Sequence, residues 1–138
     1  MRDLTAGDRL DQYLLTDVLA RTEMAMVFKG HDTENARRVC IKVPHLHYES
    51  DVVFHERFTR EERILRRLEH AHLVRAFAPR EKSRMYLVME YLDGETLRSL
   101  IAARALTLPR ALEIACQLVE TLVFLHANKI VHRDIKPE

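Results

Sequence analysis

A glutamate in the apolar stripe of a predicted helix is the first residue whose position suggests chemistry. Residues 51–69 have helical periodicity, and one stripe of this helix carries four apolar side chains, namely Phe54, Phe58, Leu65 and Leu68. Glu61 lies within this stripe: five of its six neighbours at offsets of three, four and seven residues are apolar, against two of six for Glu62. Glu61 is therefore expected to face inward, where an ionised carboxylate needs a cation. The alternative is that Glu61 lies at the edge of the stripe and reaches water.

The cation that the pattern offers is Lys42. Residues 37–43 alternate as a strand does, with Val39, Ile41 and Val43 on one face and Cys40 and Lys42 on the other. The side chain of Lys42 thus projects from the polar face of an otherwise apolar strand. The sequence predicts an ion pair between Lys42 and Glu61.

Other residue types that could do chemistry form no convincing set. The chain has 8 histidines, and the densest group is His45, His47 and His55, but no cysteine or carboxylate completes a ligand set at a usual spacing. We therefore expect no metal site. Cys40 and Cys116 are far apart and belong to no Cys-x-x-Cys pair, so two reduced, buried thiols are expected instead of a disulfide or a zinc site.

The elements that must position these residues change in kind along the chain. Five strands are expected, two of them forming a hairpin, and they surround one long helix over residues 51–69. The expected strands cover residues 13–19, 24–30, 37–43, 73–78 and 84–91. After Gly94 the periodicity becomes helical, over residues 96–104 and from Pro109 to about residue 128. The change near residues 92–94 suggests a boundary between two lobes.

The composition is that of a globular domain. Of 138 residues, 47% are hydrophobic and 31% charged, with a formal net charge of +1. These values exclude a disordered chain and give no electrostatic signature for nucleic acid or for an anionic membrane. Apolar runs such as residues 85–89 are too short to cross a bilayer, and residues 1–5 lack the apolar core of a signal peptide, so a cytoplasmic protein is expected.

The last eight residues, 131–138, read VHRDIKPE and resemble the catalytic loop of the protein kinase family. Other segments match in order: residues 39–42 resemble the strand that carries the kinase lysine, residues 60–62 the helix with its glutamate partner, and residues 86–91 the strand leading to the hinge. The resemblance covers about residues 12–138. The Asp-x-Lys-Pro-Glu form of the loop is the serine/threonine type, and the loop spacing resembles that of bacterial kinases.

This resemblance implies an α+β fold of the kinase type. The small lobe would contain a five-stranded antiparallel sheet and one long helix, followed by the first helices of a truncated, helical large lobe. In this division residues 1–12 form an N-terminal extension, residues 13–92 the small lobe with the hinge, and residues 93–138 the start of the large lobe, ending in the catalytic loop.

The resemblance also implies a reaction and the residues that perform it. Lys42, held by Glu61, would neutralise the α- and β-phosphates of ATP. Asp134 would orient the hydroxyl of a serine or threonine in a protein substrate and accept its proton, while Lys136 would balance charge on the transferred phosphoryl group. Mg²⁺ is expected for the full domain. The residues implied in nucleotide binding, with Glu90 and Leu92 acting through their backbones, are Leu19, Ala20, Thr22, Ala25, Val27, Cys40, Lys42, Met89, Glu90 and Leu92.

Two departures from the family pattern keep other functions open. Where the family has Gly-x-Gly-x-x-Gly, residues 20–25 read ARTEMA, so that β-branched Thr22 adds bulk and Glu23 adds negative charge beside the phosphates. We expect a weaker phosphate clamp, and the alternative is a pseudokinase or a regulatory nucleotide-binding module. The sequence also ends at Glu138, before the asparagine and the Asp-Phe-Gly motif that bind magnesium in the family, so the 138-residue chain alone is expected to be inactive. A naturally short chain that acts by pairing is a third possibility.

Overall fold

The computed structural model describes residues 3–138, which form two compact units. The first unit consists of the chain up to Glu69 together with Val74–Tyr91, and the second of His70–Leu73 with Leu92–Glu138. The first unit holds all the strands and the first two helices, and the second unit holds the other two helices.

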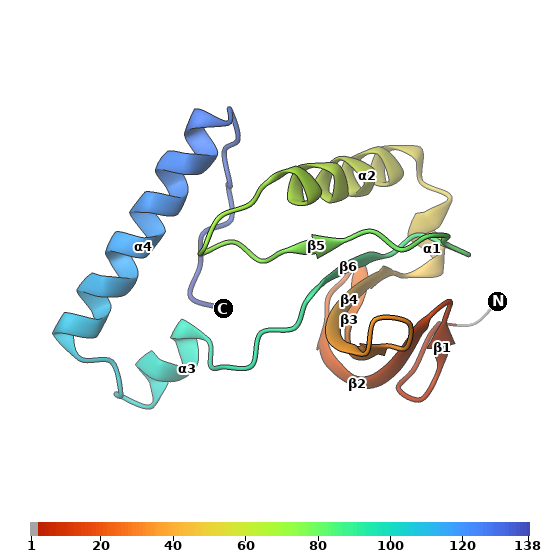
Figure 1. Ribbon diagram of the computed structural model, residues 1–138, viewed down its shortest axis with the longest axis horizontal. Coiled ribbons are helices and arrows are strands. Elements are labelled where there is room, and N and C mark those ends of the chain that lie inside the picture. Colours follow the sequence, from red (N-terminus) through yellow and green to blue (C-terminus); the bar gives the residue numbers. More distant parts are fainter. Residues whose placement is uncertain (1–2) are drawn as a thin grey trace. The chain divides into compact units, whose positions relative to one another are not determined.

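The first unit is built on a six-stranded antiparallel sheet in the order β1-β2-β3-β4-β6-β5 (Figure 1). Its strands are β1 (Arg9–Leu10), β2 (Tyr13–Arg21), β3 (Ala25–Asp32), β4 (Arg37–Pro44), β5 (Ala76–Phe77) and β6 (Leu87–Glu90). The sequence predicted five of them. It missed β1, which is too short to show alternation and turns back onto β2 through Asp11, whose φ is 51°.

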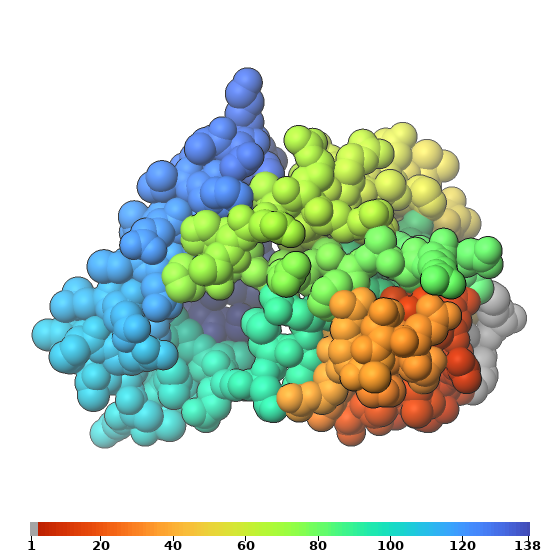
Figure 2. Space-filling model, viewed as in Figure 1, coloured from red at the N-terminus to blue at the C-terminus, as the bar shows by residue number. Residues whose placement is uncertain are grey.

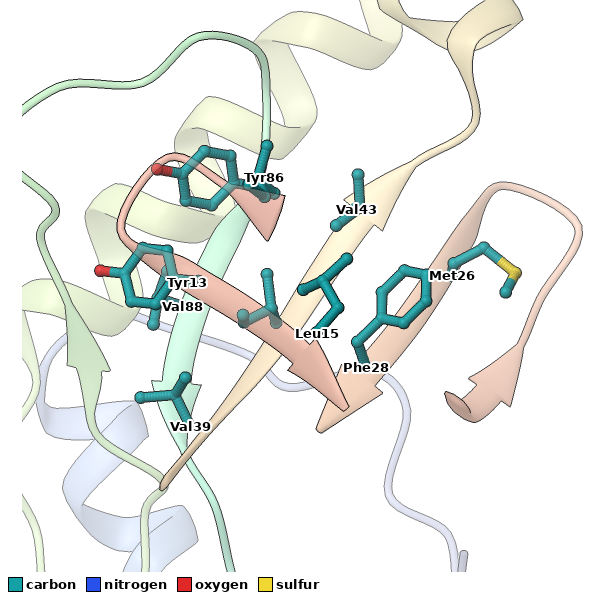
Figure 3. Packing of buried hydrophobic residues seen from close by; sticks show 10 residues of the cluster. Tyr13, Leu15, Met26, Phe28, Val39, Val43, Tyr86 and Val88 are labelled. Carbon is teal, nitrogen blue, oxygen red and sulfur yellow. The ribbon is translucent and has the colours of Figure 1, made fainter. Parts of the chain in front are cut away.

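The core of the first unit lies on one face of this sheet. Val39, Ile41 and Val43 of β4 are buried, while Cys40 and Lys42 are only half-buried, which confirms the predicted alternation. Tyr13 and Tyr86 meet edge to face within the core, with ring centroids 5.9 Å apart (Figure 3). The remaining members of this core cluster are Leu10, Leu15, Met26, Phe28 and Val88.

The turn between β3 and β4 is fixed by one carboxylate. Asp32 is fully buried and accepts hydrogen bonds from Gln12 Nε2 (2.9 Å), Asn35 Nδ2 (2.8 Å) and Arg37 Nε (3.2 Å). Burial raises the pKa of Asp32, but these hydrogen bonds outweigh it and hold the pKa below its ordinary value. The turn therefore lies against the N-terminal strands at the surface (Figure 2, orange against red).

Two helices follow β4. The short helix α1 (Leu46–Glu49) was not predicted, because four residues carry no measurable periodicity. The predicted long helix is α2 (Val52–Arg67), which begins after Asp51, whose side chain accepts the Phe54 N–H at 3.0 Å as an N-cap. Among its 16 residues only Phe58 is buried.

The second unit contains α3 (Leu97–Ala102) and α4 (Leu108–Ala127). Thr96 and Thr107 cap these helices: the hydroxyl oxygen of each accepts the backbone N–H three residues later, at Ser99 and Arg110. Residues 129–138 then run without helix or strand. Within residues 3–138, no helix is both long enough and apolar enough to cross a membrane.

The predicted burial of both thiols is only partly right. Cys40 is half-buried, but Cys116 is exposed on α4. The same helix exposes Leu112, Val119 and Val123, and its buried residues are Thr121 and Leu125. A helical stripe shows which residues share a face, but it does not show how much of that face is covered.

Candidate active site

The predicted ion pair between Lys42 and Glu61 is present. Lys42 Nζ, from β4, lies 2.8 Å from Glu61 Oε1 and 3.0 Å from Oε2, on α2. The Lys42 side chain is 30% exposed and that of Glu61 is 43% exposed, so the pair is formed at the edge of the apolar stripe and still reaches water. At this exposure we expect the pair to add no more than about 1 kcal/mol to stability. Its chief effect is to hold an ammonium group in one place.

Glu62, the neighbouring carboxylate, has only two apolar neighbours of six along the helix, which favours an exposed position, but the structure covers most of its side chain. Its side chain is only 16% exposed, because Lys82 from the loop before β6 covers it. Lys82 Nζ lies 2.7 Å from both carboxylate oxygens. Counting neighbours along one helix cannot detect a residue that arrives from a distant loop.

The residues expected to surround an adenine ring share the sheet face opposite the core. Val27 pairs with both Ala20 and Lys42, and Cys40 pairs with Met89, so strand register brings these five side chains to one face. Burial raises the pKa of the Cys40 thiol, which therefore stays neutral and acts as a small apolar side chain. Four of these five side chains are apolar, and Lys42 is the cation among them; Lys29, which pairs with Cys40, lies on the same face.

The strand pairing does not place Leu19 and the predicted hinge residues on this face. Leu19 lies at an irregularity in the pairing of β2 with β3 and is 45% exposed. The backbone N–H of Glu90 donates to the Arg75 carbonyl at 2.9 Å, so a ligand could use only the carbonyl oxygen of Glu90. Leu92 is 67% exposed and belongs to the second unit, whereas Glu90 belongs to the first.

The glycine-poor loop between β2 and β3 is closed by its own hydrogen bonds. Thr22 Oγ1 accepts the Ala25 N–H at 3.0 Å and donates to the Ala25 carbonyl at 2.9 Å, and the Thr22 N–H donates to the same carbonyl. The His45 N–H donates to the Met24 carbonyl at 3.0 Å, which ties the loop to the start of α1. The sequence drew attention to the bulk of Thr22 but missed the role of its hydroxyl group, which is typical of an ST-turn.

A cavity of about 510 Å³ lies between this loop and α2. Four of the predicted site residues line it, namely Thr22, Ala25, Lys42 and Glu61. It is also lined by residues that the sequence did not assign to a site, including Tyr48, Phe54, Arg57 and Phe58. Lys42 therefore lines a cavity that is partly open to solvent, and Arg57 supplies a second cation to its lining.

In the second unit, Asp134 and Lys136 face one another across one residue. Lys136 Nζ lies 3.3 Å from Asp134 Oδ2, and the side chains are 50% and 70% exposed, respectively. The hydrogen bond and charge of Asp134, and then those of Glu138, raise the pKa of Lys136, so its ammonium stays protonated. Arg133 has a φ of 64°, and the Asp134 N–H donates to His132 Nδ1 at 3.3 Å. This local turn presents a carboxylate and an ammonium side by side.

The described residues include no cluster of metal-ligating side chains. Across residues 3–138, no three histidine, cysteine, aspartate or glutamate side chains are grouped to hold a metal ion. His45 and His47 stack with ring centroids 5.8 Å apart.

Comparison with known proteins identifies the family. The family model for the protein kinase domain matches residues 13–138, and the chain belongs to this family. It is 39% identical over 132 residues to a probable serine/threonine-protein kinase of Streptomyces coelicolor, covering 91% of this chain and 20% of that protein. It is 37% identical over 134 residues to the serine/threonine-protein kinase PrkC of Bacillus subtilis, covering 95% and 21%. The chain thus spans about a fifth of the length of these relatives.

Solved structures agree on the fold. The kinase domain of PknI from Mycobacterium tuberculosis matches with a TM-score of 0.79 and 24% identity, over 98% of this chain and 55% of that one. The α+β fold expected from the resemblance, with an antiparallel sheet and one long helix, is therefore confirmed, with β1 as a sixth strand.

Proposed function

We propose that this segment is the ATP-binding and catalytic-loop part of a serine/threonine protein kinase. The observation that carries the proposal is the two-pronged contact of Lys42 Nζ with Glu61, at 2.8 and 3.0 Å, on the sheet face opposite the core. A lysine paired in this way has its ammonium group oriented by the carboxylate, and it presents a positioned positive charge to a polyphosphate. The serine/threonine type is supported by the names of the relatives and by Lys136.

Each side chain has a physical task in this proposal. Lys42 binds the phosphates, and the apolar face with Val27, Cys40 and Met89 receives the adenine ring. Asp134 orients the hydroxyl of a protein serine or threonine and takes up its proton, while Lys136 offsets charge on the phosphoryl group in transfer. In this family Mg²⁺ supplies further charge neutralisation when bound. Because the reaction consumes ATP, we propose the cytoplasm as its compartment.

A second function, nucleotide binding without phosphotransfer, is favoured by one observation. The Ala25 N–H, a donor in the loop that resembles the phosphate-covering loop, is already bound to Thr22 Oγ1. A loop whose donors are used internally clamps phosphate less well, which suits a pseudokinase. Against this alternative, a module that only binds nucleotide has no physical need for the paired Asp134 and Lys136.

The test is phosphotransfer by the longest natural protein that contains this segment. We expect it to transfer labelled phosphate from ATP to serine or threonine in a generic protein substrate. Asp134→Asn should lower kcat by at least about a hundredfold, because the proton acceptor is lost. The matched control is Glu120→Gln, an acid-to-amide change at an exposed position of α4, which should leave kcat unchanged.

Two other results would contradict the proposal in different ways. ATP binding that is lost in Lys42→Met, without any phosphotransfer, would favour the pseudokinase. An absence of ATP binding in the native protein would exclude both functions.

A further inference from the structure

Both glutamates at the centre of α2 are paired, but with lysines from different parts of the first unit. Glu61 pairs with Lys42 of β4, and Glu62 pairs with Lys82 of the loop before β6. The second pair is the more enclosed, with side chains that are 25% and 16% exposed, against 30% and 43% for the first. All three contacts of Lys82 Nζ, to the two oxygens of Glu62 and to the Tyr86 carbonyl, are 2.7 Å long.

Two ion pairs at adjacent helix positions restrict a motion that one pair would allow. Successive residues of an α-helix point about 100° apart around its axis. Glu61 alone would let α2 roll about a single contact, whereas Glu61 and Glu62 together, bound to different partners, fix the rotation of the helix. Any roll of α2 that moves Glu61 away from Lys42 must also pull Glu62 from Lys82.

Apolar packing gives α2 little other restraint. Phe58 is its only buried residue, while Val52 and Val53 at its start are 71% and 57% exposed. Most helices of this length are held by a buried apolar stripe. The ion pairs of α2 therefore matter more for its position than such pairs usually do.

The segment that follows Lys82 is itself anchored to two parts of the first unit. The Ser83 N–H donates to Asp11 Oδ2 at 3.0 Å, and the Tyr86 hydroxyl donates to the same oxygen at 2.7 Å. Arg84, whose side chain is 5% exposed, donates through Nε to Glu49 at 2.7 Å and through Nη2 to the Pro44 carbonyl at 3.0 Å.

These anchors connect Lys82 to rigid parts of the unit. Tyr86 belongs to the core, and Lys82 Nζ also lies 5.2 Å from the centroid of its ring. Pro44 ends β4, the strand of Lys42, and Glu49 ends α1, the helix before α2. Lys82 is thus a fixed point against which α2 can be positioned.

We propose that Lys82 is a positioning residue: through Glu62 it fixes the rotation of α2 and so keeps Glu61 at the ammonium group of Lys42. Its consequence for phosphotransfer rests on the proposed function, because a displaced Glu61 leaves Lys42 free to turn away from the phosphates. The positioning itself does not depend on that function and can be measured without nucleotide.

The test measures how fast acetic anhydride labels Lys42 in the nucleotide-free protein, using the longest natural chain and mass spectrometry. An ion-paired ammonium group reacts slowly because its carboxylate partner covers part of it, as Glu61 covers Lys42 Nζ at 2.8 and 3.0 Å. In Lys82→Met, which keeps an aliphatic side chain but removes the charge, we expect Lys42 to react about fivefold faster. Glu62→Gln should give the same increase, and the double variant should give no more, because both changes break one contact. Lys82→Arg should restore slow labelling.

Two controls separate positioning from general loosening. Lys29 of β3 reports on the rest of the first unit and should react at an unchanged rate. The matched control is Arg110→Met, which breaks the exposed ion pair with Glu113 on α4 and should not alter Lys42. Unchanged labelling of Lys42 in both Lys82→Met and Glu62→Gln would overturn the proposal. An equal increase at Lys29 would also overturn it, because the pair would then support the whole unit.

The functional consequence has a separate readout. In the same variants we expect kcat to fall with little change in KM for the protein substrate, since that substrate does not contact α2 in the proposed mechanism. If the native protein transfers no phosphate but Lys42 still loses protection in Lys82→Met, the proposed function fails and the positioning role stands. If the native protein is active and the variants keep both its kcat and the slow labelling of Lys42, the positioning role fails alone.

Discussion

The hydroxyl group of Thr22 should weaken nucleotide binding, and two substitutions separate it from the bulk of the side chain. The hydroxyl accepts the Ala25 N–H at 3.0 Å, so this donor is not available to a phosphate. Thr22→Val keeps the branched shape and removes the hydroxyl. Thr22→Ser keeps the hydroxyl and removes the branch. We expect tighter ATP binding in Thr22→Val and native binding in Thr22→Ser.

The size of the effect follows from the contacts that are exchanged. A backbone N–H released by the substitution can donate to a charged phosphate oxygen, which contributes about 1.5–3 kcal/mol. The turn also loses the hydrogen bond from Thr22 Oγ1 to the Ala25 carbonyl, so ordering the freer loop on binding costs about 1 kcal/mol. The difference is about 1 kcal/mol, which corresponds to about fivefold tighter binding.

The assay is a calorimetric titration of the nucleotide-free protein with ATP, ADP and adenosine. The gain should appear with ATP and ADP but not with adenosine, which has no phosphate to accept the hydrogen bond. Tighter binding in Thr22→Ser but not in Thr22→Val would refute this reasoning and leave side-chain bulk as the cause. No change in either variant would mean that the loop donors do not reach the phosphates.

Two further changes test the sheet that carries the site. Gly30→Ala should lower the free energy of unfolding by about 1–3 kcal/mol in chemical denaturation, because the new Cβ would lie 2.8 Å from Ile41 Cδ1 and 3.0 Å from a backbone oxygen. The control is Gly94→Ala, whose new Cβ would have no atom within 4 Å and should change the free energy of unfolding little. Asp32→Asn should also lower the free energy of unfolding at pH 6, by about 2 kcal/mol. The folded state lowers the pKa of Asp32, so the stability that this carboxylate contributes is complete above its unfolded pKa of 3.8. That contribution is lost as the pH falls through the lowered pKa of the folded state. The difference between native protein and Asp32→Asn should therefore shrink at pH 3, and a constant difference would contradict this assignment.

The parts of the site that the sequence predicted are those set by local periodicity. Alternation along β4 placed Lys42 opposite the core, and helical spacing placed Glu61 at the apolar stripe of α2. Both patterns repeat within a few residues, so they can be recognised in a single sequence. The kinase fold was recognisable for the additional reason that residues 131–138 form a continuous motif.

The parts that the sequence did not predict depend on partners from distant segments or on a single side-chain hydrogen bond. Glu62 is covered by Lys82, which follows it by twenty positions, so no helix pattern could place it. The hydroxyl of Thr22 closes the loop through Ala25, and a residue type alone does not show whether a hydroxyl group bonds to water or to the backbone. β1 has only two residues, which is too few to show an alternation of apolar and polar side chains.

Because of the loop and α2, most of the proposed phosphate recognition depends on the positive charge of Lys42. The loop keeps two of its own backbone donors, the N–H groups of Thr22 and Ala25, within its turn, so backbone N–H groups contribute less to binding than a glycine loop would allow. The ammonium of Lys42 must then supply a larger share, and its position depends on Glu61, at 2.8 Å. Glu61 depends in turn on the rotation of α2, which in this proposal Glu62 and Lys82 fix together with the single buried residue of that helix. A change at Lys82, outside the cavity, should therefore affect this site more than it would affect one whose phosphates are held by the backbone.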